Sequence, residues 1–119
     1  MAEPFRPRRT RRSGPEAKIQ EAIMAKLKAW DWLCIATHGN EYQMGFPDLY
    51  CAHRLYGQRW IECKNPTSYR FTDAQREVFP LMQSKGVGIW ILTSAEDVEV
   101  MKIFDAPNWH LYLPIITGR

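Results

Sequence analysis

The sequence predicts an α/β domain in which a mixed central β-sheet has helices on its faces. Three observations predict this class. Apolar residues at helical spacing come first, two strand-like segments follow around one glycine, and a continuous apolar run lies behind a capped helix. With 119 residues, of which 45% are hydrophobic, the chain can close one compact core. We therefore expect one folded domain, residues 15–119, preceded by an arm, residues 1–14.

The arm is strongly basic. It contains five arginines and one acid, although the whole chain has a formal net charge of only +3. The arginines are Arg6, Arg8, Arg9, Arg11 and Arg12. Because each phosphate that an arginine neutralises releases counterions, the arm predicts a nucleic acid as a partner and disorder before binding. A solubilising tail is the alternative interpretation.

No apolar stretch in the sequence suits a secretory signal or a bilayer-spanning helix. We therefore expect an intracellular protein without a membrane partner, either cytoplasmic or associated with the nucleoid. The three cysteines, Cys34, Cys51 and Cys63, lie in apolar segments without a C-x-x-C pair. They are interpreted as reduced core residues rather than as zinc ligands.

The first helix is predicted to begin at Ser13, with Pro15 in the first turn and Glu16 at the capping-box position. It should end near Trp30. The apolar positions that recur at helical spacing and define its inward face are Ile19, Ile23, Leu27 and Trp30. Residues 32–37 follow as a short strand.

Residues 48–56 and 58–65 are predicted to form a β-hairpin joined at Gly57. If the hairpin turns around Tyr56, Asp48 lies opposite Lys64 and diagonal to Glu62. Pro66 stops the second strand.

The rest of the chain alternates helices and strands. Thr72 and Gln75 form a capping box that opens a helix ending near residues 85–86, and Pro80 should kink or break it. The apolar run 87–93 is typical of a strand covered on both faces, so we place it at the centre of the sheet. A short helix to about Phe104 follows, and residues 109–116 are predicted to form a last strand at an edge.

Two charged residues stand inside an otherwise apolar strand. Glu62 and Lys64 are two positions apart, so both side chains emerge on one face. Burying charges there is costly unless a ligand uses them. Mg²⁺ is held by one or two carboxylates together with water and phosphate, so Asp48 and Glu62 are predicted ligands of Mg²⁺ or Mn²⁺. A salt bridge between Lys64 and either carboxylate is the alternative.

The motifs Pro47-Asp48 and Glu62-Cys63-Lys64 resemble the signature of the PD-(D/E)XK nuclease superfamily. The closer likeness is to its VRR-NUC (virus-type replication-repair nuclease) domain. That family has a helix with a glutamate, a G-x-P-D motif, a strand with E-x-K, a glutamine opening the next helix and a glycine before a buried strand. The matching residues are Glu16, Gly45 to Asp48, Glu62 to Lys64, Gln75 and Gly86. The likeness covers about residues 15–104.

The resemblance implies a restriction-endonuclease-like core and metal-dependent hydrolysis of DNA. The implied catalytic residues are Asp48, Glu62, Lys64, Gln75 and Glu16, and the implied metal ligands are Asp48, Glu62, the backbone carbonyl of Cys63 and Glu16. Two alternatives stay open: Glu16 as the capping partner of Ser13, and Gln75 as that of Thr72. Two roles stay open for Lys64, which either orients and helps deprotonate the attacking water or neutralises charge. His38, Tyr69 and Arg70 are weaker candidates for the DNA path, as is Gln20 for the site.

The resemblance also implies the substrate. Small stand-alone relatives imply a structure-selective endonuclease, virus-encoded or cellular, with four-way (Holliday) junctions as the leading substrate. We expect a homodimer, because resolving a junction takes two cuts related by two-fold symmetry. Residues 109–116 are the candidate subunit contact. The alternatives are a catalytically inert nucleic-acid-binding module, a restriction-like or nicking endonuclease, and a protein-interaction domain.

Overall fold

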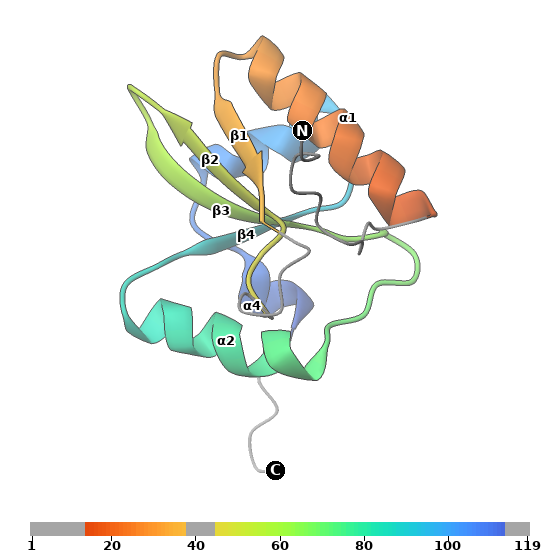
Figure 1. The fold of residues 1–119 in the computed structure, drawn as a ribbon, viewed down its shortest axis with the longest axis vertical. Helices are drawn as coiled ribbons and strands as arrows, with labels where there is room; N and C mark the ends of the chain where they lie inside the picture. Colours follow the sequence, from red (N-terminus) through yellow and green to blue (C-terminus); the bar gives the residue numbers. More distant parts are fainter. Residues whose placement is uncertain (1–13, 38–44, 114–119) are drawn as a thin grey trace, which may run out of the picture.

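The computed structural model of the chain describes residues 14–37 and 45–113. Four strands form one sheet in the order β1-β2-β3-β4, with helices on both of its sides (Figure 1). The elements are α1 (Pro15–Ala29), β1 (Leu33–Ala36), β2 (Leu49–His53), β3 (Gly57–Cys63), α2 (Asp73–Ser84), β4 (Ile89–Leu92), α3 (Asp97–Val100), the 3₁₀ helix η2 (Met101–Phe104) and α4 (Trp109–Tyr112). The predicted α/β class with a mixed sheet and flanking helices is confirmed. The finer prediction of a restriction-endonuclease-like core stays a prediction.

The sheet combines two kinds of pairing. β1, β2 and β3 pair antiparallel, while β3 and β4 pair parallel. Parallel neighbours need a crossover connection, and α2 supplies it between β3 and β4. This β3-α2-β4 unit places the start of α2 beside the end of β3, where Glu62 and Lys64 lie.

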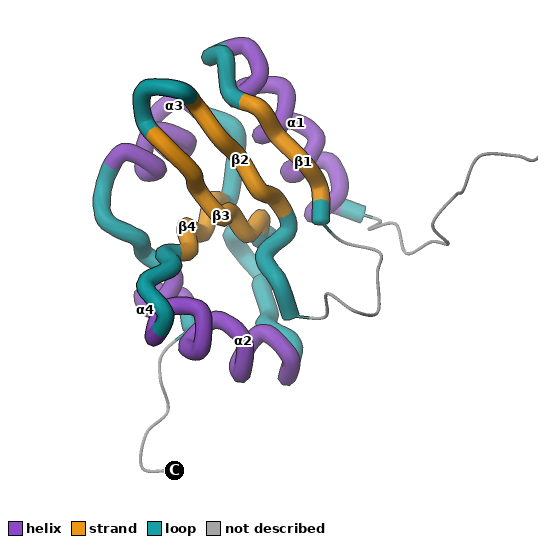
Figure 2. Tube along the Cα trace, turned by 60° about the vertical axis from the view of Figure 1, so that its left-hand side comes forward, coloured by secondary structure: helices purple, strands orange, loops and turns teal. Residues whose placement is uncertain are grey.

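Two hydrophobic cores lie on opposite faces of the sheet. On one face, Ile23 and Leu27 of α1 pack with Ile61, Cys63 and residues of α3 and η2. On the other face, Phe79 and Trp109 pack with Ile89 and Ile91 of β4. Figure 2 shows α1 and α2 on opposite sides of the strands. Because side chains alternate along a strand, Glu62 faces the α2 side while Ile61 and Cys63 face α1.

The first helix matches its predicted span, and its start differs in detail. Gly14 is the N-cap, and no side chain caps the helix. Ser13, the predicted N-cap, lies outside the described residues. Ile23 and Leu27 are fully buried, whereas Ile19 and Trp30 are half-buried.

The second helix carries the predicted capping box. The Thr72 side chain accepts a hydrogen bond from the Gln75 backbone, and the Gln75 side chain accepts one from the Thr72 backbone. The helix continues through Pro80 to Ser84, so it is not broken there.

The hairpin register differs from the predicted one by two residues. His53 pairs with Gly57 and Leu49 with Ile61, so the turn is centred on Leu55 and not on Tyr56. The reason is Gly57, whose φ of 87° lets it close a three-residue turn from the left-handed region. Continued by one residue, this register puts Asp48 opposite Glu62 rather than opposite Lys64.

The position predicted for the apolar strand was wrong. All four residues of β4 are buried, as expected, but β4 lies at the end of the strand order. Its outer edge is covered by the side chain of Asn108. The Asn108 Oδ1 accepts a hydrogen bond from the Ile91 N–H (2.6 Å), and its Nδ2 donates to the Ile91 carbonyl (3.2 Å). This amide pairs with one residue of the outer edge, while the two hydrophobic cores bury the side chains of β4 on both faces, so β4 is buried without being central.

The predicted last strand was also wrong. Residues 109–112 form the short helix α4, and residues 114–119 lie outside the described part of the chain. Trp109 and Leu113, four positions apart, are both buried against the α2 side of the sheet. Leu111 is exposed. The apolar residues at 109 and 113 follow helical spacing and serve internal packing, so this described segment does not supply the expected edge strand.

The cysteines are free and buried, as predicted. Cys34 and Cys51 face each other across β1 and β2, with their Sγ atoms 3.6 Å apart. The hydrogen bond to Cys34, together with burial, raises the pKa of Cys51 above its ordinary value. None of the described helices is long and apolar enough to cross a bilayer.

Candidate active site

Residues 45–47 lead to Asp48, which lies directly before β2. Gly45 has a φ of 85°, and a Cβ on it would lie 2.7 Å from the carbonyl oxygen of Ala74 in α2. Glycine is therefore required for the loop to dock on this helix. On the other side, the Thr37 N–H donates to the Asp48 carbonyl (2.8 Å), and the Thr37 hydroxyl donates to the Pro47 carbonyl. Asp48 is thus held between β1 and α2.

The carboxylates of Asp48 and Glu62 are buried on neighbouring strands. Glu62 is wholly buried and Asp48 is 6% exposed. Asp48 Oδ2 accepts a hydrogen bond from the Cys63 N–H at 2.8 Å, and Glu62 Oε1 accepts one from the Asp48 N–H at 3.1 Å. The geometry therefore brings two carboxylates to one end of the hairpin.

Lys64 joins the same cluster and is itself buried. Its Nζ lies 3.0 Å from Glu62 Oε2, donates to the Arg70 carbonyl at 2.6 Å and donates to Gln75 Oε1 at 3.3 Å. The ammonium also lies 4.5 Å from the centre of the Phe71 ring, a favourable cation–π position. An ammonium has three N–H donors. All three have oxygen partners in the structure, so Lys64 can contact a phosphate or a water only by exchanging one of them.

Gln75 lies where both interpretations of its sequence position require it, in the capping box with Thr72 and beside the charged residues of the candidate site. Its Oε1 accepts the Thr72 N–H at 3.1 Å in the capping box. The same oxygen accepts from Lys64, and the Nε2 donates to Glu62 Oε2 at 2.9 Å. Gln75 therefore fixes the start of α2 to the two charged side chains of β3. Its catalytic role stays a prediction.

Glu16 lies on α1, which covers the other face of the sheet. Its Oε2 accepts a hydrogen bond from the Asn65 N–H at 3.3 Å, one residue beyond Lys64. Within the described residues, no three side chains of His, Cys, Asp or Glu form a group that could hold a metal ion. The structure therefore does not bring Glu16 into one cluster with Asp48 and Glu62, and its role as a ligand stays a prediction.

The two carboxylates match a hard divalent cation in donor type. Asp48 and Glu62 supply carboxylate oxygens, which Mg²⁺ and Mn²⁺ prefer, and Mg²⁺ sites use one or two protein carboxylates. One turn after Glu16, the buried Gln20 Oε1 has no hydrogen-bond partner among the described residues. The Cys63 backbone contributes its N–H to Asp48, whereas its carbonyl as a metal ligand stays a prediction.

The remaining predicted residues divide by location. Tyr69 and Arg70 are exposed and line a surface cavity, while His38 and the five arginines of the arm lie outside the described residues. Sequence reasoning missed Thr37, the Arg70 carbonyl and the Phe71 ring. Phe71 could have been noticed as an aromatic residue directly before a capping box. Nothing in the sequence marks the Arg70 carbonyl.

No family model, curated protein or solved structure matches the chain. The likeness to the VRR-NUC domain therefore depends on the quoted motifs alone.

Proposed function

We propose that this protein is a divalent-metal-dependent nuclease that hydrolyses phosphodiester bonds in branched DNA. The observation that carries the proposal is the pair of buried carboxylates, Asp48 and Glu62, with the Lys64 ammonium 3.0 Å from Glu62. Buried charges on adjacent strands are costly to keep. They are typical of a site that uses them.

In this proposal each side chain has a separate task. Asp48 and Glu62 bind Mg²⁺ or Mn²⁺ through oxygens that the hydrogen bonds to Cys63 and Asp48 orient. A cation held by these two residues would polarise the scissile phosphate and lower the pKa of a bound water. Lys64 leaves one of its three partners and donates to the phosphate. Gln75 holds the side chains of Glu62 and Lys64 in position through hydrogen bonds of its side-chain amide.

The proposed substrate is a four-way junction, and the proposed working unit is a homodimer. One chain offers one pair of these carboxylates in its described residues, while a junction requires cuts in two strands related by two-fold symmetry. The subunit contact is not assigned to residues 109–116, because Trp109 and Leu113 are buried internally. Sedimentation at micromolar concentration with and without DNA tests this claim. A strict monomer that cuts flaps and leaves junctions whole would reject it.

The nuclease proposal is tested by incubating the purified protein with junction, flap and linear duplex DNA. We expect cleavage with Mg²⁺ or Mn²⁺ and none with a chelator. Ca²⁺ should support binding with little turnover, because its looser coordination positions water poorly. DNA that stays intact under every condition would reject the nuclease and leave the inert nucleic-acid-binding module.

The inert nucleic-acid-binding module is the second candidate. The full set of partners around Lys64 favours it, because a satisfied buried network can serve structure alone. Its prediction differs from that of the nuclease. Binding of junction DNA should then be independent of Mg²⁺ and unchanged by Asp48→Asn.

A further inference from the structure

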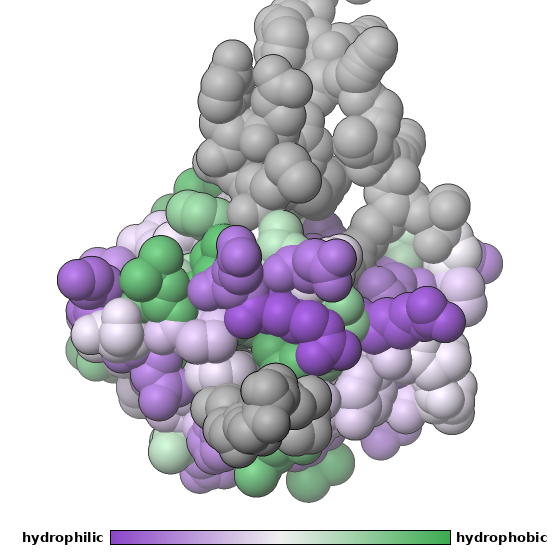
Figure 3. Space-filling model, turned by 90° about the horizontal axis from the view of Figure 1, so that it is seen from below, coloured by the Kyte–Doolittle hydropathy of each residue, from purple (hydrophilic) through white to green (hydrophobic). Residues whose placement is uncertain are grey.

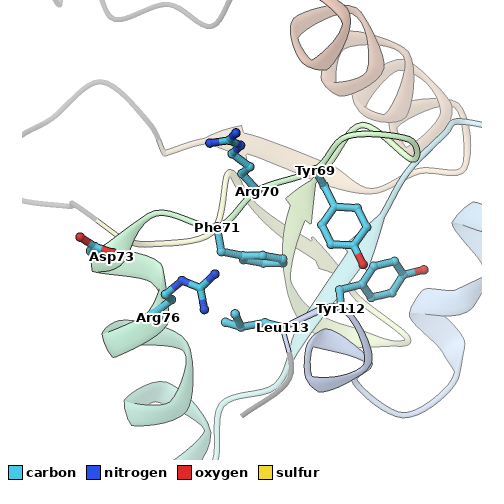
Figure 4. Close-up of a pocket in the computed structure, with 7 residues that line it drawn as sticks. All are labelled: Tyr69, Arg70, Phe71, Asp73, Arg76, Tyr112 and Leu113. Atoms are coloured by element: carbon cyan, nitrogen blue, oxygen red, sulfur yellow. The ribbon is translucent and has the colours of Figure 1, made fainter. Parts of the chain in front are cut away.

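A surface cavity of about 420 Å³ borders the candidate active site. Its lining residues are Tyr69, Arg70, Phe71, Asp73, Arg76, Tyr112 and Leu113 (Figure 4). Two of them also contact Lys64, since Arg70 accepts its hydrogen bond through the backbone and Phe71 lies under its ammonium. A ligand in the cavity would therefore contact the residues that also contact Lys64.

One wall of the cavity is aromatic. The Tyr69 ring packs edge-on against Phe71 and Tyr112, with centroid distances of 5.9 and 5.7 Å. Tyr69 is 38% exposed, so part of its ring is open to solvent. Exposed aromatic rings stack with nucleobases, and every base has a face for such contact. Phe71 in turn packs edge-on against the buried Phe79, which connects this wall to the hydrophobic core.

The opposite wall is cationic. Figure 4 shows the Arg76 guanidinium extending from α2 toward Phe71 and Leu113, while the Arg70 guanidinium points away from them at the rim. The Asp73 carboxylate also points away from the rings. Among the described residues, neither arginine side chain forms a hydrogen bond or an ion pair.

The contrast with Arg59 shows why these arginines are available to a ligand. The Arg59 guanidinium donates to the carbonyls of Ile103, Tyr56 and Gln58 and lies 5.0 Å from the Trp90 ring centre. It is a structural arginine. Arg76 is exposed on α2. Seen from below, the molecule presents hydrophilic side chains with hydrophobic ones between them (Figure 3).

We propose that this cavity is a subsite for one nucleotide of a single-stranded segment of DNA. Arg76 pairs with its phosphate, and its base lies against Tyr69. The volume is at the small end of ligand sites, about 300 to 1,000 Å³, which suits one nucleotide and not a duplex. As a position on the substrate strand, the subsite rests on the proposed nuclease function. As a binding site, it does not.

The test measures binding of a fluorescent thymidine hexanucleotide to the full chain, with a chelator present so that cleavage cannot interfere. Arg76→Gln should weaken binding about tenfold and reduce the salt slope by about 0.7, the value for one phosphate of a single strand. Tyr69→Ala should weaken binding about tenfold through the absence of stacking. Arg54→Gln is the matched control, since Arg54 is exposed at the turn of the hairpin and carries the same charge. It should change affinity less than twofold.

Equal losses in Arg76→Gln and Arg54→Gln would overturn the subsite and leave only a general effect of charge. An abasic hexamer that binds wild-type protein as tightly as the thymidine hexamer would overturn the stacking against Tyr69. The nuclease assay is read separately on wild-type protein. Selective loss in Arg76→Gln without any DNA cleavage would support the subsite and reject the nuclease. DNA cleavage by the wild type, together with equal losses of affinity in Arg76→Gln and Arg54→Gln, would support the nuclease and reject the subsite.

Discussion

The side chains of Asp48 and Glu62 each accept a hydrogen bond from the backbone of the opposite strand. Asp48 Oδ2 takes the N–H of Cys63, and Glu62 Oε1 takes the N–H of Asp48. Pro47, the residue before Asp48, has no backbone N–H that could hydrogen-bond to β3. The two carboxylates therefore continue the pairing of β2 and β3 where the backbone cannot. The same hydrogen bonds fix the direction of both carboxylates before any ligand arrives.

This arrangement makes Glu62 a structural residue as well as a proposed ligand. Glu62→Gln removes the charged partner of buried Lys64, and breaking a buried pair from one side costs about 3 to 5 kcal/mol. We expect the free energy of unfolding in urea to fall by about that amount. In the double variant Glu62→Gln/Lys64→Met, part of the loss should be recovered, because no unpaired ammonium remains. A single variant as stable as the wild type would contradict the pairing.

Lys64 should affect the chemical step more than binding. Lys64→Met keeps an unbranched side chain and removes the ammonium that lies over Phe71. We expect the single-turnover rate to fall by about 100-fold or more, as for loss of one electrostatic donor, while DNA affinity changes little. Lys85→Met, at an exposed position after α2, is the matched control. If saturating protein restores the rate of Lys64→Met, Lys64 is a binding residue instead.

The arginine arm should bind phosphates without regard to DNA sequence. Deleting residues 1–12 removes all five of its arginines. We expect weaker DNA binding and a flatter dependence of affinity on salt, by about 0.9 in slope for each duplex phosphate that the shortened protein no longer neutralises. Cleavage at saturating protein should persist, because none of the proposed ligands lies in the arm. An unchanged salt slope would leave the arm without this function.

The pH dependence of stability should depend on Glu99. Burial raises the pKa of Glu99, but hydrogen bonds from Lys102 and Thr93 outweigh it, and the net pKa lies below its ordinary value of 4.5. A lowered carboxyl pKa contributes stability that is complete above the unfolded-state value and disappears as pH falls through the folded-state value. Melting temperatures should therefore drop on acidification below about pH 4.5 less steeply for Glu99→Gln than for the wild type. Melting temperatures that fall equally steeply with pH in both proteins would contradict this role of Glu99.

The elements whose local signals agree with their packing could be predicted from the sequence. The capping box of Thr72 and Gln75 and the buried run 87–93 were placed correctly. The position of β4 in the sheet was not, because a continuous apolar run reports burial and not neighbours. The residue that covers its edge, Asn108, lies sixteen positions beyond the strand and has no distinctive local pattern.

The sequence grouped four residues of the candidate site but misplaced their register, and it also included Glu16, which lies on α1 and contacts Asn65 instead. Asp48, Glu62, Lys64 and Gln75 do lie together, as their alternation and order suggested. Which residues face each other depends on the turn, and the left-handed φ of Gly57 shifted the register by two. The segment after residue 108 failed for another reason. Its apolar residues fit both a period of two and a spacing of four, and burial of Trp109 with Leu113 decides for the helix.

The most direct test of the central claim is single-turnover cleavage of a four-way junction by Asp48→Asn with Mg²⁺ at saturating protein. Asparagine keeps an oxygen for the Cys63 N–H and removes the charge that a metal requires. Asp31→Asn is the matched control, at an exposed turn with a φ of 73° that asparagine adopts readily. We predict that the control cuts at the wild-type rate and that Asp48→Asn does not cut. Cleavage by Asp48→Asn at the wild-type rate would contradict the assignment of Asp48 as a metal ligand and with it the proposed site.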